Sequence, residues 1–351
     1  MILTFKYRIK DRRARKFLAQ HAVACNKIWN WCVAQHRDTL DRYRAGAKRR
    51  PWLSTFDLGR TFNGIGKDIG LHQQTVRSVC EQWSRDRSIR FRASFGLNRA
   101  RGWVPFQLQS RKIDGNSVTY LGHTYRFFGN KRRPLTGNAK GGSFVEDALG
   151  RWWVCFHVEV EQAKAAIGEV GIDLGLKDFA VFSTGEKIAA PQFYRRHEER
   201  LVIAQRAGNA SLVKALHMKV ANRRRDFHHK LSTRLSRSYA FIAVGDVNPK
   251  RLAQTRMAKS VFDAGWSNFR SMLRYKAAQF AEVDEKFTTQ TCSSCGALPP
   301  ERPRGIAGLG IRVWECSACG KSHDRDVNAA LNILKLGRSV TPLVEESRRA
   351  A

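Results

Sequence analysis

Apolar and polar positions alternate in two different ways along the chain, and the pattern changes near residue 168. At the start, residues 1–8 alternate as a half-buried strand does, whereas residues 14–43 repeat their apolar positions at the spacing of an amphipathic helix. Helical spacing resumes over 53–86. From 88 to 160, short alternating segments lie between turns rich in Gly and Asn. The first half therefore predicts a β-barrel that is interrupted by a helical insertion.

The helical pattern of the first half also predicts its buried side chains. Those expected to face the core are Phe17, Cys25, Ile28, Trp29, Cys32, Leu58, Phe62, Val76 and Trp83. The barrel is expected at residues 1–10 and 88–165, and the helical insertion at 11–87. A linker over 162–168 ends this half.

After this linker, predicted strands alternate with helices, which is typical of an α/β domain. The expected strands cover 170–176, 179–183, 187–189, 240–247 and 280–287. The expected helical regions cover 195–237, 263–279 and 324–336. The α/β domain is thus predicted over 166–289 and 323–336, with a cysteine-rich module inserted at 290–322. The polar segment 337–351 is predicted to be a disordered tail.

The charge of the chain indicates the class of its partner. The 351 residues include 63 Lys and Arg against 30 Asp and Glu, a formal net charge of +33. Residues 1–168 contain 32 basic and 12 acidic residues, and residues 169–351 contain 31 and 18, so both halves are basic. Nucleic acid neutralises such a surface with release of counterions. A solvated surface or a lipid-binding face is the alternative, but no amphipathic membrane helix or polybasic terminus supports it.

The apolar residues and cysteines indicate a cellular compartment. No apolar run approaches the roughly 20 residues of a membrane span, and the amino terminus has no signal-peptide core. Four of the eight cysteines have metal-site spacing; the others, Cys25, Cys32, Cys80 and Cys155, lie among apolar residues. We therefore expect a reduced cytoplasmic protein with no membrane partner.

Four cysteines near the carboxyl end have the spacing of a structural zinc site. Cys292-x-x-Cys295 and Cys316-x-x-Cys319 supply two pairs of thiolates, which suit tetrahedral Zn²⁺. Because four thiolates close the coordination shell, the zinc would fold the module and perform no chemistry. The sequence therefore predicts a zinc ribbon over 290–322.

One acidic residue lies within a strongly apolar predicted strand. Asp173 stands between Gly171 and Gly175, and strand periodicity puts these three residues on one face. The glycines leave space beside the carboxylate for a metal and a phosphate. A turn or edge-strand role is the alternative, but a carboxylate in an apolar strand is costly unless it is bound. We therefore expect Asp173 to bind a metal.

Two further acids mark the start of the last predicted helix. Asp324 has the position of an N-cap, which is a very common role for Asp. Asp326 lies further into the first turn and is free to face the sheet. Beside Asp173 and the ribbon, Asp326 predicts a metal site that is split between distant segments of the chain.

These motifs together closely resemble the TnpB proteins, transposon-encoded RNA-guided DNA nucleases from which type V CRISPR effectors descend. The resemblance covers about 168–336, and its motifs are Gly-Ile-Asp-x-Gly at 171–175, Asp-Val-Asn at 246–248, Tyr-Lys at 275–276, the two Cys-x-x-Cys pairs and Asp-Arg-Asp-x-Asn-Ala-Ala at 324–330. The first half is similar only in kind, with wedge-like barrel strands and a helical recognition insertion. The resemblance implies a multidomain α/β protein whose second half is a RuvC-like, RNase-H-type nuclease domain with an inserted zinc ribbon. It also implies a bound guide RNA and a short motif next to the target in double-stranded DNA.

The resemblance also implies roles for individual residues. By motif position, Asp173 and Asp326 correspond to the first and last catalytic acids, which hold Mg²⁺, and the four ribbon cysteines hold Zn²⁺. The family usually places a catalytic glutamate where this chain has Gly245. Because two-metal hydrolysis needs carboxylates around both ions, another acid has to take this place or the site is inactive.

Strand periodicity favours Glu285 as the missing acid. In the strand predicted next to that of Gly245, Glu285 shares a face with Ala281 and Val283, whereas Glu282 does not. Asp246 is the second alternative, but a step of one residue along a strand reverses the face, so only a bulge or the strand's end would re-aim it. The third alternative is that no acid replaces the glutamate.

Runs of basic residues are candidates for nucleic-acid contacts. They include Arg49 and Arg50 in the first half and Arg223, Arg224 and Arg225 on a predicted helix in the second. Each run is also compatible with an ordinary solvated face. The excess positive charge favours phosphate contacts by the group as a whole.

Three functional hypotheses follow. The favoured one is an RNA-guided, Mg²⁺-dependent DNA endonuclease, in which base pairing selects the target. The second is an RNA-guided repressor that binds DNA without cutting, which the glycine in place of glutamate motivates. The third is a guide-independent RuvC-type nuclease, which explains neither the ribbon nor the basic first half. The resemblance implies a bacterial or archaeal, nucleoid-associated protein, and the sequence leaves its oligomeric state open.

Overall fold

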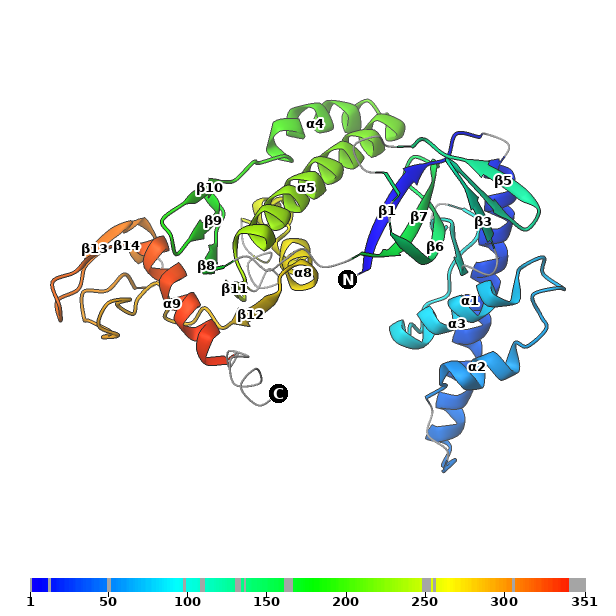
Figure 1. Ribbon diagram of the computed structural model, residues 1–351, viewed down its shortest axis with the longest axis horizontal. Coiled ribbons are helices and arrows are strands. Elements are labelled where there is room, and N and C mark those ends of the chain that lie inside the picture. The colour runs from blue at the N-terminus through cyan, green and yellow to red at the C-terminus, as the bar shows by residue number, and fades with distance from the viewer. Residues whose placement is uncertain are drawn as a thin grey trace. The chain divides into compact units, whose positions relative to one another are not determined.

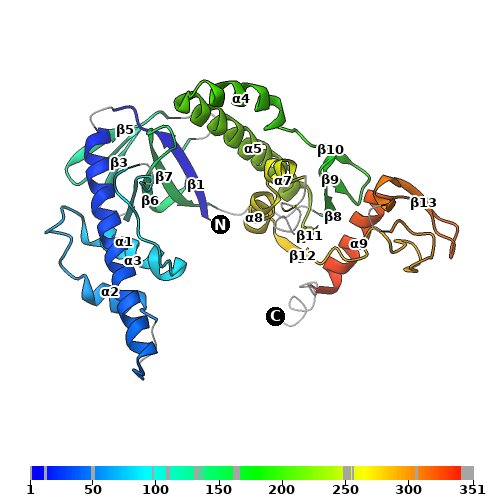
Figure 2. The same cartoon turned by 180° about the vertical axis from the view of Figure 1, so that it is seen from behind.

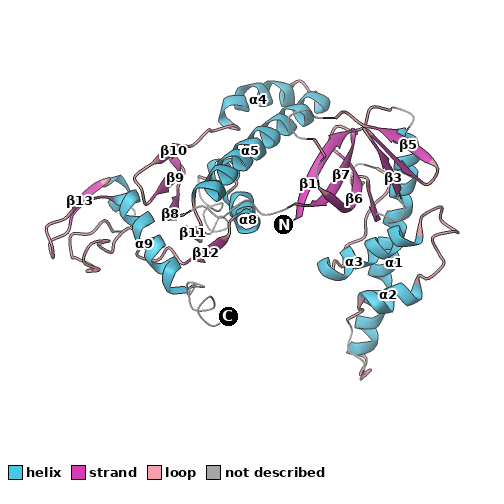
Figure 3. Ribbon diagram, in the orientation of Figure 1, coloured by secondary structure: helices cyan, strands magenta, loops and turns pink. Residues whose placement is uncertain are grey.

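The chain divides into two compact units, Met1–Glu161 and Gln162–Ala351. The computed structural model describes residues 2–11, 14–48, 52–96, 99–107, 111–129, 134–135, 137–160, 167–247, 254, 257–304 and 307–340. Both units combine helices with sheets, so the predicted mixed α/β class is confirmed (Figure 3). Most of the expected linker, residues 162–166, lies outside the described residues.

The first unit contains two antiparallel sheets (Figure 1). The larger has the order β1-β7-β6-β2, and its strands are β1 (Ile2–Arg8), β2 (Trp103–Gln107), β6 (Asn138–Glu146) and β7 (Trp152–Glu159). The smaller is a meander of β3 (Arg111–Asp114), β4 (Ser117–Tyr120) and β5 (His123–Arg126). Both sheets contribute aromatic side chains to one core, among them Phe106, Tyr120, Phe144 and Phe156.

The described strands of the first unit do not form the closed barrel that the sequence predicted. The two sheets are linked by one isolated bridge, between Ile9 and Phe127. In the larger sheet, β1 and β2 are the outer strands and do not pair with each other. Alternation along a strand determines which face is buried but not which edges pair, so the prediction of a closed barrel was wrong for this part of the chain.

Three helices lie between β1 and β2 in the first unit. They are α1 (Ala14–Arg44), α2 (Thr55–Thr61) and α3 (Gln73–Asp86). The predicted core positions are buried, except that Phe17 is 37% exposed and stacks on His123 with ring centroids 3.9 Å apart. At the first turn of α1 the apolar face reaches the edge of the core, which helical periodicity alone does not show.

The second unit is built on one five-stranded sheet with the order β10-β9-β8-β11-β12. Its strands are β8 (Glu169–Leu174), β9 (Asp178–Phe182), β10 (Lys187–Ala189), β11 (Phe241–Gly245) and β12 (Gln279–Val283). The first three pair antiparallel, and β11 pairs parallel to both β8 and β12. The carboxyl ends of β8, β11 and β12 therefore lie at one edge of the sheet.

Helices cover both faces of this sheet. One face carries Val170, Ile172, Ile242 and Val244 and packs against α5 (Ala210–Ser238), α7 (Ala258–Ala264) and α8 (Trp266–Lys276) (Figure 2). The other face carries the alternate residues, among them Ala243 and Ala281, and packs against α9 (Arg325–Val340). The long basic helical region predicted over 195–237 is divided into a 3-10 turn (Arg195–His197), α4 (Glu198–Arg206) and α5.

The helix α9 is longer than predicted and lies unusually close to the sheet. It continues to Val340, so residues 337–340 belong to the helix and not to a disordered tail; residues 341–351 lie outside the described residues. A Cβ at Gly171 would overlap the Ala330 carbonyl oxygen, and a Cβ at Gly337 would lie 2.5 Å from that of Ala243. Glycine at both positions permits this close approach.

The cysteine-rich module lies between β12 and α9. It contains the 3-10 turn Ala307–Gly310 and the short hairpin of β13 (Val313–Glu315) and β14 (Ser322–Asp324). The hairpin leads directly into α9, so the fold of this module determines where the helix begins. None of the helices within the described ranges is long and apolar enough to cross a membrane.

Candidate nuclease and zinc sites

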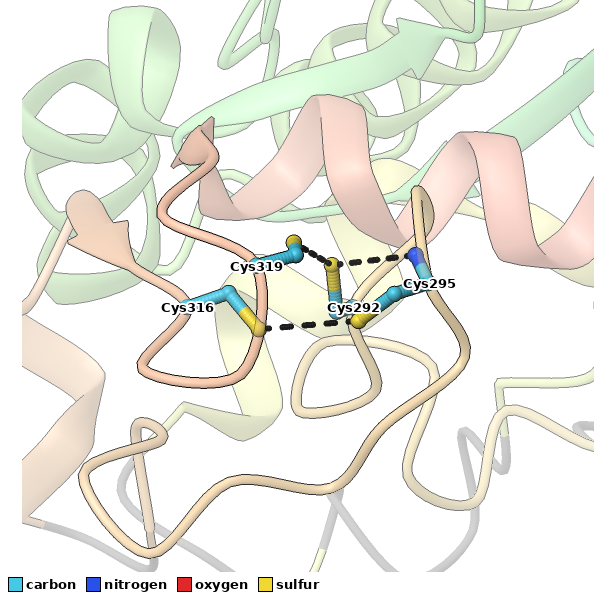
Figure 4. Close-up of side chains that lie close together, drawn as sticks. All are labelled: Cys292, Cys295, Cys316 and Cys319. Atoms are coloured by element: carbon cyan, nitrogen blue, oxygen red, sulfur yellow. Dashed lines mark hydrogen bonds between the residues drawn. The ribbon is translucent and has the colours of Figure 1, made fainter.

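The four ribbon cysteines converge on one point (Figure 4). Their sulfur atoms lie within 4.8 Å of one another, and the Cys292–Cys319 and Cys295–Cys316 sulfur pairs are each 3.7 Å apart. Tetrahedral zinc with Zn–S bonds of about 2.3 Å requires sulfur separations of about 3.8 Å. The donor set and the spacing therefore fit Zn²⁺, and no coordination position is left for a substrate.

Hydrogen bonds favour a thiolate at Cys292. Burial opposes its ionisation, but the backbone N–H groups of Cys295 and Ser294 and the ring of His323 lower the pKa of Cys292 to about 5. His323 Nε2 lies 3.0 Å from the Cys292 sulfur, and its ring packs against Trp314. A ligand that is already ionised near neutral pH suits a zinc site, because metals bind the thiolate.

The first turn of α9 separates the roles of two neighbouring acids. Asp324 Oδ1 accepts the backbone N–H groups of Asp326 and Val327, at 3.1 and 3.0 Å, which is the N-cap role expected for it. Asp326 instead forms ion pairs with Arg312, at 2.9 Å, and Arg325, at 3.1 Å. Asp326 thus lies on the first turn with its carboxylate already neutralised by two guanidinium groups.

The structure places Asp173 on the face of β8 that α9 covers. Gly171, two residues earlier, contacts Ala330, and Asp326 lies one helical turn before Ala330. Burial raises the pKa of Asp173 well above its ordinary value, and the charges of Glu285 and Asp326 add to the effect. The strand and the helix therefore bring these carboxylates into electrostatic contact, although 153 positions separate Asp173 from Asp326 in the sequence.

Glu285 occupies the space beside Gly245. A Cβ at Gly245 would overlap the Glu285 carboxyl group, so the two positions complement each other. Glu285 lies two residues beyond Val283, the last residue of β12, so it continues the same alternation along the strand. Val283 is the residue of β12 that pairs with Gly245. Its Oε1 is buried and has no hydrogen-bond partner, and burial together with the charge of Asp246 raises the pKa of Glu285 to about 7.

The two acids that periodicity disfavoured differ in where they lie relative to Glu285. Glu282 is on the opposite face of the sheet, where it pairs with Arg270, at 2.7 Å, and with Arg274. Asp246 follows the last residue of β11 and is exposed, while its backbone N–H donates to the Val283 carbonyl. The face predicted for Glu282 agrees with the structure, whereas the charge of Asp246 acts on Glu285. The catalytic roles themselves stay a prediction.

The three proposed Mg²⁺ ligands are neighbours but not a closed ligand set. Within the described part of the chain, the cysteine cluster is the group whose donor atoms all lie within 4.8 Å of each other. The donor chemistry around Asp173, Asp326 and Glu285 nevertheless fits a hard cation, because carboxylate oxygens are its preferred ligands. The buried, unpartnered Glu285 oxygen also fits such an ion.

Two asparagines that sequence reasoning missed connect the ribbon to the acids. The side-chain amides of Asn328 and Asn332 both donate to the carbonyl oxygens of Thr288 and Thr291, at 2.7–3.2 Å. Thr288 in turn donates its hydroxyl to the Glu285 carbonyl, at 2.8 Å. Two asparagines four residues apart in a helix were the available signal, because this spacing puts both on one face.

The predicted arginine contacts differ in accessibility. Arg224 is only 22% exposed and pairs with Asp263 at 3.0 Å, so its side chain is used within the fold. Arg223 and Arg225 are exposed on α5 and remain candidates for phosphate contacts. Arg49 and Arg50 lie outside the described residues.

Two family models match the second unit and the residues just before it. One, described as "Probable transposase", covers residues 154–256, and the other, described as "Cas12f1-like, TNB domain", covers 266–333. Curated relatives agree with these matches. A protein of Acanthamoeba polyphaga mimivirus named "TnpB-like protein L79" is 30% identical over an alignment of 240 positions, and the match covers 58% of this chain and 45% of the relative. The resemblance to TnpB is confirmed.

Other curated relatives and a solved structure extend the comparison. A protein of Streptomyces pristinaespiralis named "Putative RNA-guided DNA endonuclease" is 38% identical over 227 residues, so the chain spans 55% of that relative. The InsQ protein of Escherichia coli strain K12, with the same description, is 26% identical over 96% of this chain and 92% of its own length. A solved Cas12f1–sgRNA–target DNA complex aligns over 95% of this chain and 99% of its own, with a TM-score of 0.37 and 13% identity.

Proposed function

We propose that the chain is an RNA-guided DNA endonuclease whose second unit is a RuvC-like, RNase-H-type nuclease domain. In this proposal residues 166–289 and 323–336 form the nuclease domain and 290–322 a zinc ribbon. The first unit, with its sheets and the helical insertion at 11–87, holds guide RNA and reads a short motif beside the target. The net charge of +33 and the names of two relatives, both described as putative RNA-guided DNA endonucleases, support this function.

One observation carries the nuclease assignment. The Glu285 carboxyl group fills the space beside Gly245, and the charges of Glu285 and Asp326 both act on Asp173. A glutamate with a buried, unpartnered oxygen is costly for stability alone, since an unsatisfied buried polar atom costs about 1–3 kcal/mol. A relocated metal ligand explains why the chain keeps it.

The acidic and basic residues of the proposed site would have different chemical roles. Asp173, Glu285 and Asp326 would hold Mg²⁺, which supplies Lewis acidity and an activated water for phosphodiester hydrolysis. Burial and mutual repulsion keep the pKa of Asp173 high, so the metal-free site holds protons that a cation would displace. Arg312 and Arg325 neutralise Asp326 and add positive charge where a DNA phosphate would approach.

The alternative is a repressor that binds guide-matched DNA without cutting it. Gly245 motivates this alternative, because the family's usual glutamate is absent from β11. The ion pairs of Asp326 are also compatible with it. The carboxyl of Glu285 in the vacated space favours the nuclease.

Sequencing of the RNA that co-purifies with the full chain tests the guided function. We expect one abundant RNA that matches DNA beside or overlapping the gene of this protein. Protein purified with random RNA would instead favour a guide-independent nuclease. Protein that carries no nucleic acid at low salt would contradict both RNA-guided hypotheses, the nuclease and the repressor.

A further inference from the structure

Four side chains of the first unit form a stack that leads from its core to its surface. Trp83 of α3 and His36 of α1 are buried, and their rings meet edge to face at 5.3 Å and 67° (Figure 1 shows both helices). Trp52 stacks on His36 at 5.6 Å, with 27° between the rings. The Arg87 guanidinium carbon lies 4.9 Å from the Trp52 ring centre. This Arg87 stack thus ends on an exposed guanidinium plane.

The backbone at the outer end of the Arg87 stack is strained. Arg87 caps α3 in the left-handed conformation, with φ 47° and ψ 38°, and its N–H donates to the Trp83 carbonyl at 2.7 Å. Glycine is the usual residue at this position, and a side chain there costs roughly 1 kcal/mol. Because the backbone alone favours glycine, the arginine side chain requires another explanation.

The segment that follows Arg87 is rigidly attached although it has no regular secondary structure. Residues 88–92 lie along α1, where Trp29 Nε1 donates to the Arg90 carbonyl at 3.3 Å. Asn30 exchanges two hydrogen bonds with the Arg92 backbone, at 3.1 and 2.7 Å. These side-chain bonds hold the extended backbone of the segment against α1.

Apolar and aromatic side chains in and beside the stack are partly exposed, and arginine side chains lie over two of the rings. Ile89 is 56% exposed, Phe91 51% and Trp52 52%. Arg37 lies over the Phe91 ring at 4.5 Å and donates to the Ile89 carbonyl at 2.8 Å. The surface therefore combines flat π groups with positive charge, held on a fixed backbone.

We propose that the Arg87 stack and Phe91 form a stacking surface for unpaired bases of RNA. Bases stack on aromatic rings and on guanidinium planes alike, and arginines beside them neutralise phosphates. A protein contact would gain little from rings that guanidinium groups already cover, whereas a base extends the same stack. This inference rests on the proposed RNA-guided function and names the part of the first unit that holds single-stranded nucleotides.

Two variants at Arg87 separate stacking from charge and from stability. Arg87→Lys keeps the charge and removes the planar group. Arg87→Gly relieves the left-handed backbone. The matched control is Arg42→Lys, an exposed arginine of α1 that pairs with Asp38 at 3.0 Å and contacts no ring that the structure describes. The full chain, cleared of bound RNA at high salt, is titrated with labelled oligoadenylate of about 12 nucleotides and with a blunt RNA duplex of the same length.

We expect Arg87→Lys to weaken oligoadenylate binding by roughly tenfold, with an unchanged salt slope and unchanged duplex binding. Arg87→Gly should weaken oligoadenylate binding at least as much while the melting temperature stays equal or rises. Arg42→Lys should behave as wild type.

Equal affinity of wild type and Arg87→Lys for oligoadenylate would overturn the stacking inference alone. If Arg87→Lys instead disrupts a dimer without changing RNA affinity, the surface is a protein contact and the inference is also wrong. Wild type that binds neither RNA would overturn the proposed function as well.

Discussion

Gly245 and Glu285 are complementary, and each explains the other. The glycine leaves a space at the end of β11, and the glutamate from the loop after β12 fills it. Periodicity in the sequence predicted which side Glu285 faces, because Val283 and Glu285 keep the alternation of the strand. The ion pairs that Arg312 and Arg325 form with Asp326 could not be predicted, since they depend on how the ribbon folds back on α9.

Gly245→Ala tests this complementarity. The added methyl group overlaps the Glu285 carboxyl, so we expect Glu285 to be displaced and cleavage of guide-matched DNA to be lost. Overpacking of this kind costs about 1–3 kcal/mol of stability. Ala243→Gly, on the same face of β11 but away from the acids, is the control and should lower the melting temperature without abolishing cleavage. An active Gly245→Ala enzyme would contradict the role of Glu285.

His228 gives the second unit a pH-dependent stability. Burial, with smaller contributions from Arg224 and His229, lowers the pKa of His228 to about 4, and its Nε2 lies 2.9 Å from the Ala264 carbonyl. Because the unfolded chain binds this proton at higher pH, the stabilisation is present above about pH 6.5 and is lost as the pH falls toward 4. His228→Gln should flatten the decline of the melting temperature over this range. An unchanged pH profile would show that His228 is not the cause.

At the scale of elements, α9 connects the zinc module to the acids. The hairpin of β13 and β14 sets its first turn, Asn328 and Asn332 hold the loop after Glu285, and Gly171 lets it approach the sheet. The zinc is therefore expected to be structural and still necessary for the site.

Cys316→Ser tests this connection. We expect loss of bound zinc, measured by metal analysis, and a lower melting temperature of the second unit, because metal binding and folding are coupled in such modules. Ser317→Ala, next to it and exposed, should change neither property. A metal-free Cys316→Ser protein with unchanged melting would show that the ribbon does not depend on zinc.

The order of the elements could be read from the sequence, but several of their ends and contacts could not. β8, β9 and β11 lie within two residues of their predicted bounds, because buried strands carry a strong apolar signal, and the exposed edge strand β10 has the predicted bounds. The end of α9 was missed, since the sequence after Gly337 is polar while its position is fixed by contact with β11. Closure of the first-unit strands likewise depends on edge pairing, which no local pattern contains.

At the scale of the whole molecule, the excess positive charge is expected to determine the affinity for RNA. Both units are basic, so RNA binding should involve many phosphates. We expect the affinity for the co-purifying RNA to fall steeply between low and physiological salt, with log K linear in log salt. Titration at several salt concentrations measures this slope. An affinity for RNA that does not change with salt concentration would contradict the role of the excess charge in binding phosphates.

The most direct test compares target binding and cleavage side by side at one salt concentration, with the co-purified RNA and its matched DNA. We predict that Asp173→Ala, Glu285→Ala and Asp326→Ala each abolish Mg²⁺-dependent cleavage and leave binding nearly intact. Glu282→Ala should still cut, and so should Asp246→Ala. Wild type that binds its matched target but never cuts it would establish the repressor instead, and normal cutting by Glu285→Ala with none by Asp246→Ala would contradict the assignment of the third acid.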